Sequence, residues 1–255
     1  MIPAEHPCLS AQAHFRYGRI HLPVAPRCNI RCGYCDRRYD CANESRPGVT
    51  SEVISPEAAL DRVERALRLD SRLRVAGVAG PGEPLANPAT LEARFPRLLL
   101  CLSTNGLVLS DALPELLDCG VSTLTVTVNT RSVVCAGHVY RTVGGSADAG
   151  AMAAFLSAQQ EGVAKAAEAG LTVKINTVVI PGVNTGEIEG IACWAARAGA
   201  AVMNLMPLIP QAGFRDNEPP SQALLDALRA RARVHIPQFT HCRQCRADAV
   251  GVPGE

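Results

Sequence analysis

The sequence predicts an α/β fold in which six strand–helix units form a partial barrel that is open on one side. Short apolar runs rich in β-branched residues alternate about six times with segments of helical periodicity, which is typical of a parallel sheet with helical crossovers. Six units are fewer than the eight that close a full barrel. With 255 residues, 47% of them hydrophobic, the chain is long enough to bury the core of such a domain.

The periodicity places each element in order. Strands are expected at 20–25, 74–79, 98–103, 123–128, 172–179 and 201–206. Helices are expected at 56–69, 110–118, 152–169, 185–198 and 221–233, with a cramped one around 88–95. Ser55 is the expected N-cap of the first helix, and Gly120, Gly170 and Gly199 are expected at the C-terminal ends of three others. Gly-, Asn- and Cys-bearing segments follow the strands, so we expect the site at the carboxyl ends of the strands.

Charge and cysteine content narrow the functional class. The 25 Lys and Arg residues nearly balance the 24 Asp and Glu residues, so nothing predicts a nucleic-acid or anionic-membrane partner. No signal peptide and no apolar run of membrane-spanning length occurs, so we expect a cytoplasmic protein. Eleven cysteines in a reducing compartment favour metal or redox chemistry over disulfides.

A C-x3-C-x2-C triplet, Cys28, Cys32 and Cys35, follows the first predicted strand directly. Three thiolates on one loop can hold three irons of a four-iron cluster and leave the fourth iron open to a ligand. A zinc knuckle is the alternative, but structural zinc normally takes a fourth Cys or His, and none follows at short spacing.

A second motif, Cys242 and Cys245, forms a C-x2-C pair near the C-terminus. Zinc and a thioredoxin-like redox pair are alternatives for this motif alone. Its place in an irregular tail favours metal ligation, completed by residues from elsewhere in the chain. The candidates are Cys8, Cys41, Cys101, His21 and His6.

The triplet stands among other segments that match one family: His6-Pro7-Cys8, Arg19-Ile20-His21, 39–49, 101–107, 174–182, 204–209 and 241–251. Together they closely resemble the NifB family of radical S-adenosylmethionine (SAM) enzymes, the maturases of the nitrogenase cofactor. The resemblance runs from residue 6 to about residue 254. It implies a partial (βα)6 barrel of the radical SAM type over residues 1–255, with a core of about 18–235. The N-terminal extension 1–17 and the C-terminal tail 236–255 are expected to contribute cluster ligands.

The activity that the resemblance implies is carbide synthesis. Two auxiliary 4Fe-4S clusters, K1 and K2, are fused with an added sulfur and a carbide from a SAM methyl group into an eight-iron cofactor precursor. One SAM methylates a cluster sulfide, and a second gives a 5′-deoxyadenosyl radical that abstracts hydrogen from that methyl group. The alternatives are a radical SAM enzyme with auxiliary clusters that acts on an organic or peptide substrate, and a noncatalytic iron–sulfur carrier or zinc-stabilised scaffold.

The resemblance also assigns residues to roles. Cys28, Cys32 and Cys35 hold the SAM cluster, His21, Cys41 and Cys101 bind K1, Cys242 and Cys245 bind K2, and Cys8 binds one of the two. Tyr34 is expected near the adenine, Gly80, Gly82 and Glu83 at the SAM amino group, Ser103 and Asn105 at its carboxylate and ribose, and Asn176 at the ribose. Glu44 and Arg46 are expected either to act at the clusters, as an acid–base group or transient ligand and as a donor to sulfides, or to anchor the long loop. Without the family, His21 reads as a core histidine and Cys101 as a buried apolar residue.

The implied partners are SAM, an electron donor such as ferredoxin or flavodoxin, iron–sulfur cluster donor proteins, a cofactor carrier protein and the nitrogenase maturation scaffold. No appended carrier domain follows the C-terminal cysteines, so we expect a separate carrier. We expect the protein to be a monomer.

Overall fold

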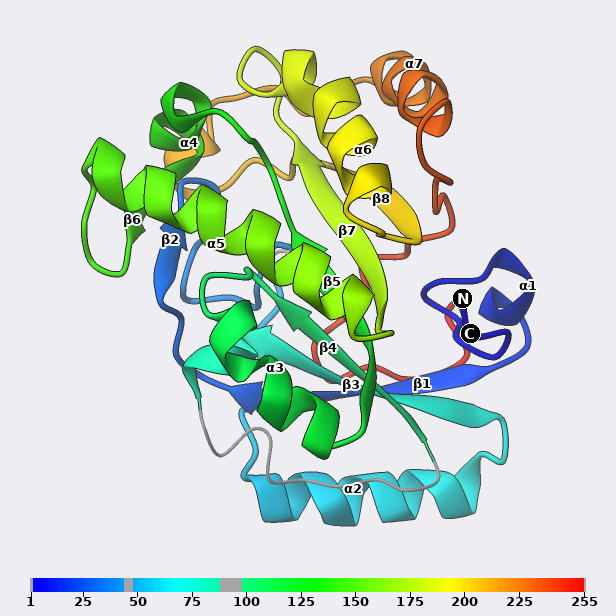
Figure 1. Ribbon diagram of the computed structural model, residues 1–255. Helices are drawn as coiled ribbons and strands as arrows, with labels where there is room; N and C mark the ends of the chain where they lie inside the picture. Colours follow the sequence, from blue (N-terminus) through cyan, green and yellow to red (C-terminus); the bar gives the residue numbers. More distant parts are fainter. Residues whose placement is uncertain (1, 44–47, 88–97, 255) are drawn as a thin grey trace.

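Six parallel strands form the centre of the computed structural model, which describes residues 2–43, 48–87 and 98–254. They follow one another across the sheet in chain order (Figure 1): β1 (Gly18–Ala25), β3 (Leu73–Pro81), β4 (Leu99–Thr104), β5 (Val121–Thr127), β7 (Thr172–Val179) and β8 (Val202–Pro207). β8 lies at one edge of the sheet, and the short antiparallel strand β9 (Val250–Gly251) covers β1 at the other. Among the described residues the two edges do not pair, which confirms the partial barrel that is open on one side.

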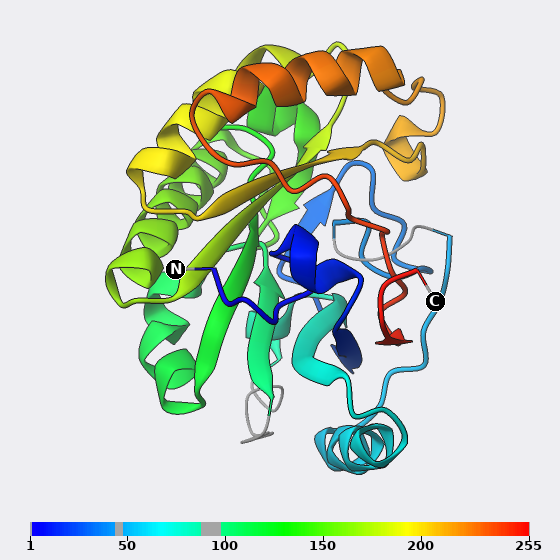
Figure 2. The same ribbon diagram turned by 90° about the vertical axis from the view of Figure 1, so that its right-hand side faces the viewer.

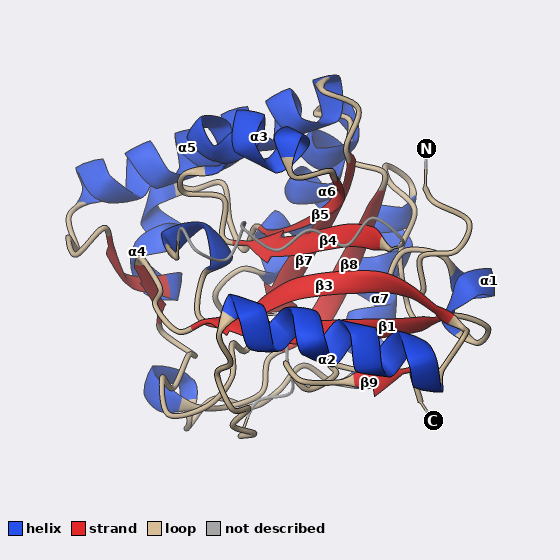
Figure 3. Ribbon diagram, turned by 90° about the horizontal axis from the view of Figure 1, so that it is seen from below, coloured by secondary structure: helices blue, strands red, loops and turns tan. Residues whose placement is uncertain are grey.

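The helices that follow these strands cover the outer face of the sheet (Figures 1 and 3): α2 (Pro56–Leu69), α3 (Leu109–Asp118), α5 (Ala149–Glu168), α6 (Ile188–Arg197) and α7 (Gln222–Arg233). The predicted caps are present. The Ser55 hydroxyl accepts a hydrogen bond from the N–H of Ala58 at 3.2 Å. Gly120, Gly170 and Gly199 have positive φ angles just after α3, α5 and α6.

Two predicted helices differ from the observed elements or lie beyond them. The segment predicted as one helix at 185–198 begins as a 3-10 turn, η3 (Thr185–Glu187), and becomes α-helical only at α6. The helix predicted around 88–95 lies outside the described residues.

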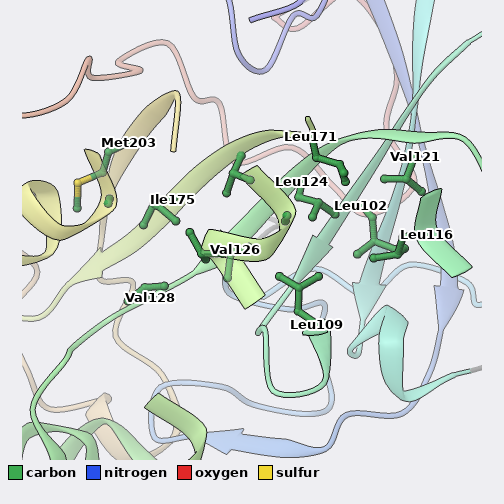
Figure 4. Packing of buried hydrophobic residues seen from close by; sticks show 14 of the residues in the cluster. Leu102, Leu109, Leu116, Val121, Leu124, Val126, Val128, Leu171, Ile175 and Met203 are labelled. Carbon is green, nitrogen blue, oxygen red and sulfur yellow. The ribbon is translucent and has the colours of Figure 1, made fainter. Parts of the chain in front are cut away.

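Successive side chains of the strands point to opposite faces of the sheet, which places apolar side chains on the outer face and polar ones on the inner face. Leu102, Leu124 and Ile175 belong to the core cluster that packs between the sheet and the helices (Figure 4). Their neighbours in sequence lie on the opposite face, because successive side chains of a strand alternate. These neighbours line a cavity inside the barrel: Cys101 and Ser103 of β4, Thr125 of β5, and Lys174 and Asn176 of β7. The outer face thus holds the fold together, and the inner face is left for chemistry.

A small second sheet, which the sequence did not predict, supports the cysteine triplet. β2 (Ile30–Cys32) pairs with β6 (Tyr140–Val143), which follows the short helix α4 (Val133–Val139) between β5 and α5. Because Cys32 is part of β2, this pairing anchors the loop that carries the triplet. The strands are too short to show a reliable alternation, and each depends on a partner more than a hundred residues away.

The N-terminal segment and the C-terminal tail lie side by side next to β1 (Figures 1 and 2). In helix α1 (Ala11–His14), the ring of His14 lies 5.8 Å from that of Phe239 and 5.7 Å from that of His241. β9 then pairs Val250 with Ile20 of β1. Among the described residues, none of the helices is both long and apolar enough to cross a membrane.

Candidate active site

The cysteine triplet lines a space of about 360 Å³, part of it open to solvent, at the carboxyl ends of β3 and β4; we call it the triplet cavity. Its lining residues come from the loop after β1, from β2 and from the two loops that follow β3 and β4: Cys28, Ile30, Cys32, Cys35, Arg37, Cys41, Asn43, Gly82, Glu83 and Asn105. The fold thus brings the triplet together with Gly82, Glu83 and Asn105, three of the residues predicted to bind SAM.

Backbone hydrogen bonds hold the Gly82 turn against the loop of the triplet. The N–H of Gly82 donates to the carbonyl oxygen of Ala25 at 2.6 Å, and the N–H of Glu83 donates to that of Arg27 at 2.7 Å. A side chain at position 82 would place its Cβ atom 2.1 Å from the Arg27 carbonyl oxygen, so only glycine fits. Gly82 therefore allows the backbone to pass close to the loop of the triplet, that is, to another part of the same chain.

The Glu83 carboxyl group is buried and accepts hydrogen bonds within the chain. The donors are the Thr104 hydroxyl at 2.6 Å, the N–H of Asn105 at 2.6 Å and the N–H of Leu85 at 3.1 Å. Burial raises the pKa of this carboxyl group to about 7, although these hydrogen bonds lower it. A cation would favour the ionised form, so an ammonium group is a chemically suitable neighbour for Glu83.

Burial keeps the thiols of the triplet protonated. It raises the pKa of Cys28 to about 11 and raises the pKa of Cys35. The pKa of Cys32 is also raised, by burial first and then by the neighbouring Cys35 and Cys28. Because iron binds thiolates, each thiol would release a proton on becoming a ligand.

A second space of about 730 Å³, part of it open to solvent, lies inside the barrel; we call it the auxiliary cavity. Five of the predicted auxiliary-cluster ligands line it, from four separate parts of the chain: Cys8, His21, Cys101, Cys242 and Cys245. The remaining lining residues are His6, His14, Val75, Gly77, Val78, Ser103, Thr125, Lys174, Asn176, Met206, Phe239, Arg243 and Pro253. Both chain ends therefore contribute to the same cavity as the strands.

His21 has the proton arrangement of a metal ligand. Its Nδ1 donates to the carbonyl oxygen of Arg246 at 3.0 Å. Burial, and then Arg19, lowers the pKa of the ring to about 4, so the imidazole is neutral and keeps a lone pair on Nε2. Gly77, the partner of His21 on β3, makes room for the ring, because a Cβ atom there would lie 3.2 Å from its Cδ2.

Two further histidines line the auxiliary cavity with opposite proton positions. Nδ1 of His6 accepts the N–H of Cys8 at 3.2 Å, so the neutral ring carries its proton on Nε2. Nδ1 of His14 donates to the carbonyl oxygen of Pro7 at 2.9 Å, so its Nε2 keeps the lone pair. Burial lowers the pKa of both rings, that of His6 to about 3. The N-terminal extension therefore offers one N–H donor and one further lone pair.

Arg19 connects β1 to the tail cysteines. It is buried, and its guanidinium donates to Sγ of Cys245 at 3.0 Å and to the carbonyl oxygen of Gly251. The hydrogen bond fixes the position of the Cys245 sulfur, a predicted cluster ligand, relative to β1.

Three of the predicted site residues line the other cavity from the residues with which they were expected to act. Cys41 lines the triplet cavity, whereas His21 and Cys101, its expected partners on K1, line the auxiliary cavity. Ser103 and Asn176 were expected at SAM, but they too line the auxiliary cavity. The roles of these residues remain predictions.

Four more predicted positions need separate mention, and two of them lie outside the described residues. Tyr34 is fully buried, and its hydroxyl donates to Asn43 and accepts from Asn129, which places it behind the triplet cavity and not in its lining. Gly80 lies against Cys41, because a Cβ atom at Gly80 would be 3.1 Å from the Cβ of Cys41. Glu44 and Arg46 lie outside the described residues.

The amide side chains of three asparagines lie at the boundary between the two cavities. Asn176 lines the auxiliary cavity, and its Nδ2 donates to the carbonyl oxygen of Asn43 at 3.2 Å. Asn43 lines the triplet cavity, and its own Nδ2 donates to Sγ of Cys32 at 3.8 Å. On the other side, Asn204 donates to Oδ1 of Asn176 at 3.2 Å. The two cavities are therefore direct neighbours.

The donor sets of both cavities suit iron–sulfur clusters. Thiolates are the usual cluster ligands, and four cysteines, the triplet and Cys41, line the triplet cavity together with the amide group of Asn105 and the carboxyl group of Glu83. The auxiliary cavity adds the lone pair of His21 to four cysteines. In the described part of the chain, no group of three or more His, Cys, Asp or Glu side chains is arranged to hold a single metal ion.

Sequence reasoning missed Lys174, Gly77 and Arg19 as residues of the site. One usable signal was the alternation of the strands, since Lys174-Ile175-Asn176 repeats the polar–apolar–polar order of Cys101-Leu102-Ser103. This order places the polar members of both strands on one inner face. Gly77 gave no such signal, because the need for glycine at this position comes from the His21 ring on the neighbouring strand.

Comparison with known proteins agrees with this geometry. The model of the Radical SAM superfamily matches residues 22–195. The chain is 45% identical over 269 residues to the FeMo cofactor biosynthesis protein NifB of Klebsiella pneumoniae, which covers 99% of this chain and 58% of that protein. It is 39% identical over 265 residues to the NifB of Methanocaldococcus infernus, which covers 97% of this chain and 85% of that protein. The chain thus spans little more than half the length of the Klebsiella relative.

Solved structures share the fold at low identity. Streptococcus suis SuiB aligns with a TM-score of 0.62 and 12% identity over 88% of this chain and 50% of that chain. The FeFe-hydrogenase maturase HydG from Carboxydothermus hydrogenoformans aligns with a TM-score of 0.57 and 17% identity over 85% of this chain and 51% of that chain. With the family model matched across most of the barrel and NifB relatives matched across nearly all of the chain, this protein belongs to the radical SAM superfamily and, within it, to the NifB family.

Proposed function

We propose that this protein is a carbide synthase that builds the eight-iron precursor of the nitrogenase cofactor. Its substrates are two four-iron clusters, K1 and K2, in the auxiliary cavity, and SAM with its cluster belongs to the triplet cavity. The observation that carries the proposal is the convergence of Cys8, His21, Cys101, Cys242 and Cys245 on one cavity beside the triplet. The relatives' name, FeMo cofactor biosynthesis protein, supports the class of product.

In the triplet cavity the chain binds and orients SAM. Cys28, Cys32 and Cys35 would hold the cluster, which supplies the electron for reductive cleavage of SAM. Glu83 receives the ammonium group of SAM, and Asn105 contributes an amide beside it. Asn176, which lines the auxiliary cavity, donates a hydrogen bond to the carbonyl oxygen of Asn43, which lines this one. SAM and its cluster would therefore be held beside the space proposed for the substrate clusters.

In the auxiliary cavity the chain holds the two substrate clusters. His21 and Cys101 bind K1, with Cys41 reaching it from the adjacent cavity, and Cys242 and Cys245 bind K2. Cys8 lines the same cavity as both ligand groups. Burial, with smaller contributions from Cys101 and Cys245, raises the pKa of its thiol to about 12. A neutral imidazole holds iron less firmly than a thiolate, so His21 would allow K1 to leave after conversion.

Product analysis after anaerobic reconstitution tests the proposal. We expect S-adenosylhomocysteine and 5′-deoxyadenosine together, and transfer of the iron–sulfur core to apo-nitrogenase through a carrier protein. A ferredoxin or flavodoxin is the proposed reductant, and cluster donor proteins supply K1 and K2 to the monomer. SAM cleavage without methyl transfer would instead favour an organic or peptide substrate, and no turnover would favour an iron–sulfur carrier.

Cys101→Ala separates the auxiliary cavity from the triplet. Because Cys101 lines only the auxiliary cavity, we expect this variant to keep the SAM cluster but to form at least tenfold less S-adenosylhomocysteine. Cys193→Ala is the matched control, since Cys193 lies on α6 and lines neither cavity. Equal product from Cys101→Ala and Cys193→Ala would contradict the assignment.

A further inference from the structure

Lys174 is a buried cation in the auxiliary cavity. It belongs to β7, is only 6% exposed, and lines the cavity together with Cys8, Cys101 and Cys245. The chain has 25 Lys and Arg residues, of which only Lys165 and Lys174 are lysines. Lys165 lies on α5, half exposed, in an ion pair with Glu161. At position 174 a compact ammonium group with three donors therefore stands in a chain whose usual cation is arginine.

The contacts of Lys174 leave most of its charge uncompensated. Its Nζ donates to the carbonyl oxygen of Cys8 at 3.4 Å and lies 5.7 Å from the centroid of the Phe239 ring. Neither group carries a negative charge, and a buried ammonium group is costly unless an anion balances it. The hydrogen bond to Cys8 uses one of the three donors.

The rest of the lining has the same sign. Among the described residues that line the auxiliary cavity, Lys174 and Arg243 are cationic and none is an aspartate or a glutamate. Arg19 adds a further cation through its hydrogen bond to Sγ of Cys245. The groups that can balance these charges are the cysteine thiolates and an anionic occupant bound through them. An iron–sulfur cluster with several thiolate ligands is such an anion.

We propose that Lys174 donates hydrogen bonds to the iron–sulfur cluster bound beside Cys8, one of the two that the auxiliary cavity would take, and that its charge raises the reduction potential of that cluster. The inference rests on the proposed function in one respect, the presence of a cluster in this cavity. Reduction adds a negative charge to the cluster, and a fixed cation stabilises the reduced state more than the oxidised state. Hydrogen bonds and net charge around the sulfurs are known determinants of cluster potentials.

The test uses a chain in which Cys28, Cys32 and Cys35 are all replaced by alanine, so that only auxiliary clusters form on anaerobic reconstitution with iron and sulfide. Lys174→Met removes the charge, Lys174→Arg keeps it, and Lys165→Met is the matched lysine control. Iron content and the midpoint potential, from an EPR-monitored titration, are measured for each. For Lys174→Met we expect the reduction equilibrium to shift at least tenfold toward the oxidised cluster, which is about 59 mV for one electron. We expect Lys174→Arg and Lys165→Met to stay close to the parent chain.

An isotope experiment reports on the contact directly. With two lysines in the sequence, ε-15N-lysine in the Lys165→Met chain labels the side chain of Lys174 alone. Pulsed EPR of the reduced cluster should then show a weak 15N coupling, of the size of a hydrogen bond to a sulfide and too small for an iron ligand. The coupling should disappear when Lys174→Met is added.

The outcomes separate this inference from the proposed function. Full iron content in Lys174→Met with an unchanged potential, and no 15N coupling, would overturn the role of Lys174 and leave the proposed function intact. A parent chain that binds no iron would overturn both. If folded Lys174→Met loses iron that Lys174→Arg retains, charge is needed for retention and the inference holds. If folded Lys174→Met and Lys174→Arg both lose iron, the size and shape of the lysine side chain would matter and not its charge, and this would contradict the inference.

Discussion

Two glycines at β3 control how closely the chain packs around the site. Gly82 touches the backbone of the loop that carries the triplet, and Gly77 lies under the ring of His21. Sequence reasoning identified Gly82 from its turn motif. It gave no reason for Gly77, which sits inside an apolar strand, because the side chain that requires it belongs to a strand more than fifty residues earlier.

Gly82→Ala should destabilise the protein. The added Cβ atom would meet the carbonyl oxygens of Arg27 and Ala25, and backbone atoms cannot turn away as a side chain can. We expect the free energy of unfolding to fall by about 1–3 kcal/mol, as for other overpacked sites. Gly190→Ala is the control. Gly190 lies exposed in α6 with open space around it, so alanine should raise the free energy of unfolding by about 0.5–1 kcal/mol. Denaturant unfolding measures both, and a loss of equal size in both variants would refute the steric explanation.

Glu83 should make the stability of the cluster-free protein depend on pH. Burial raises the pKa of its carboxyl group from 4.5 to about 7, so the folded state favours the protonated form. This contribution to stability is fully present below pH 4.5 and is lost as the pH rises through 7. Relative to Glu83→Gln, which cannot titrate, we expect the wild type to lose on the order of 3 kcal/mol across that window. Denaturant unfolding of both proteins at about pH 5 and pH 8 checks this, and a constant difference between them would contradict it.

The elements around the site are held at their carboxyl ends by buried asparagines. Asn184 donates from Nδ2 to the carbonyl oxygens of Asn129 and Val178, and its Oδ1 accepts the N–H of Ile180, each at 2.8 Å. It thereby ties the end of β5 to the end of β7. The sequence marks the 180–184 segment only as a loop at the functional end of the barrel. Its structural role depends on hydrogen bonds to a loop more than fifty residues away.

Asn184→Ala should lower the free energy of unfolding by more than an ordinary loop substitution does. It would leave two buried carbonyl groups and one buried N–H group without their partner, at about 1–3 kcal/mol for an unsatisfied group. We expect a loss of at least about 2 kcal/mol in the free energy of unfolding. Asn217→Ala, in a half-buried loop, should change it by no more than about 0.5 kcal/mol. Thermal unfolding of the two variants makes the comparison, and similar melting temperatures would count against the tie.

At the scale of the whole molecule, the two chain ends complete the inside of the barrel. Cys8 comes from the N-terminal extension and Cys242 and Cys245 from the tail, and the aromatic cluster of His14, Phe239 and His241 holds the two together. The inside of the six-unit barrel thus becomes a cavity with candidate ligands from both chain ends as well as from β1 and β4. The ends should therefore open and close as one unit.

Phe239→Ala tests this coupling by hydrogen exchange. Loss of the shared aromatic contact should raise amide exchange at least tenfold in residues 6–17 as well as in 239–247, although the substitution lies only in the tail. Exchange in β5 should stay unchanged, because β5 belongs to the outer core. Leu69→Ala, at an exposed position of α2, is the control. Faster exchange confined to the tail would show that the two ends open independently.

The amino-acid sequence by itself determined the six parallel strands, five of the helices that follow them, the helix caps, the triplet and the family, because these depend on local periodicity and on short contiguous motifs. It also listed most of the ligand candidates, although from the residues alone His21 and Cys101 could be read as core positions. Only the tertiary structure decided which candidates meet: Cys41 lines the triplet cavity, and Lys174, Arg19 and Gly77 join the auxiliary cavity or its immediate surroundings. The physical reason is that strand alternation and the pairing of distant segments select the inner face, and neither the register between strands nor the path of the chain ends is written in any single stretch of sequence.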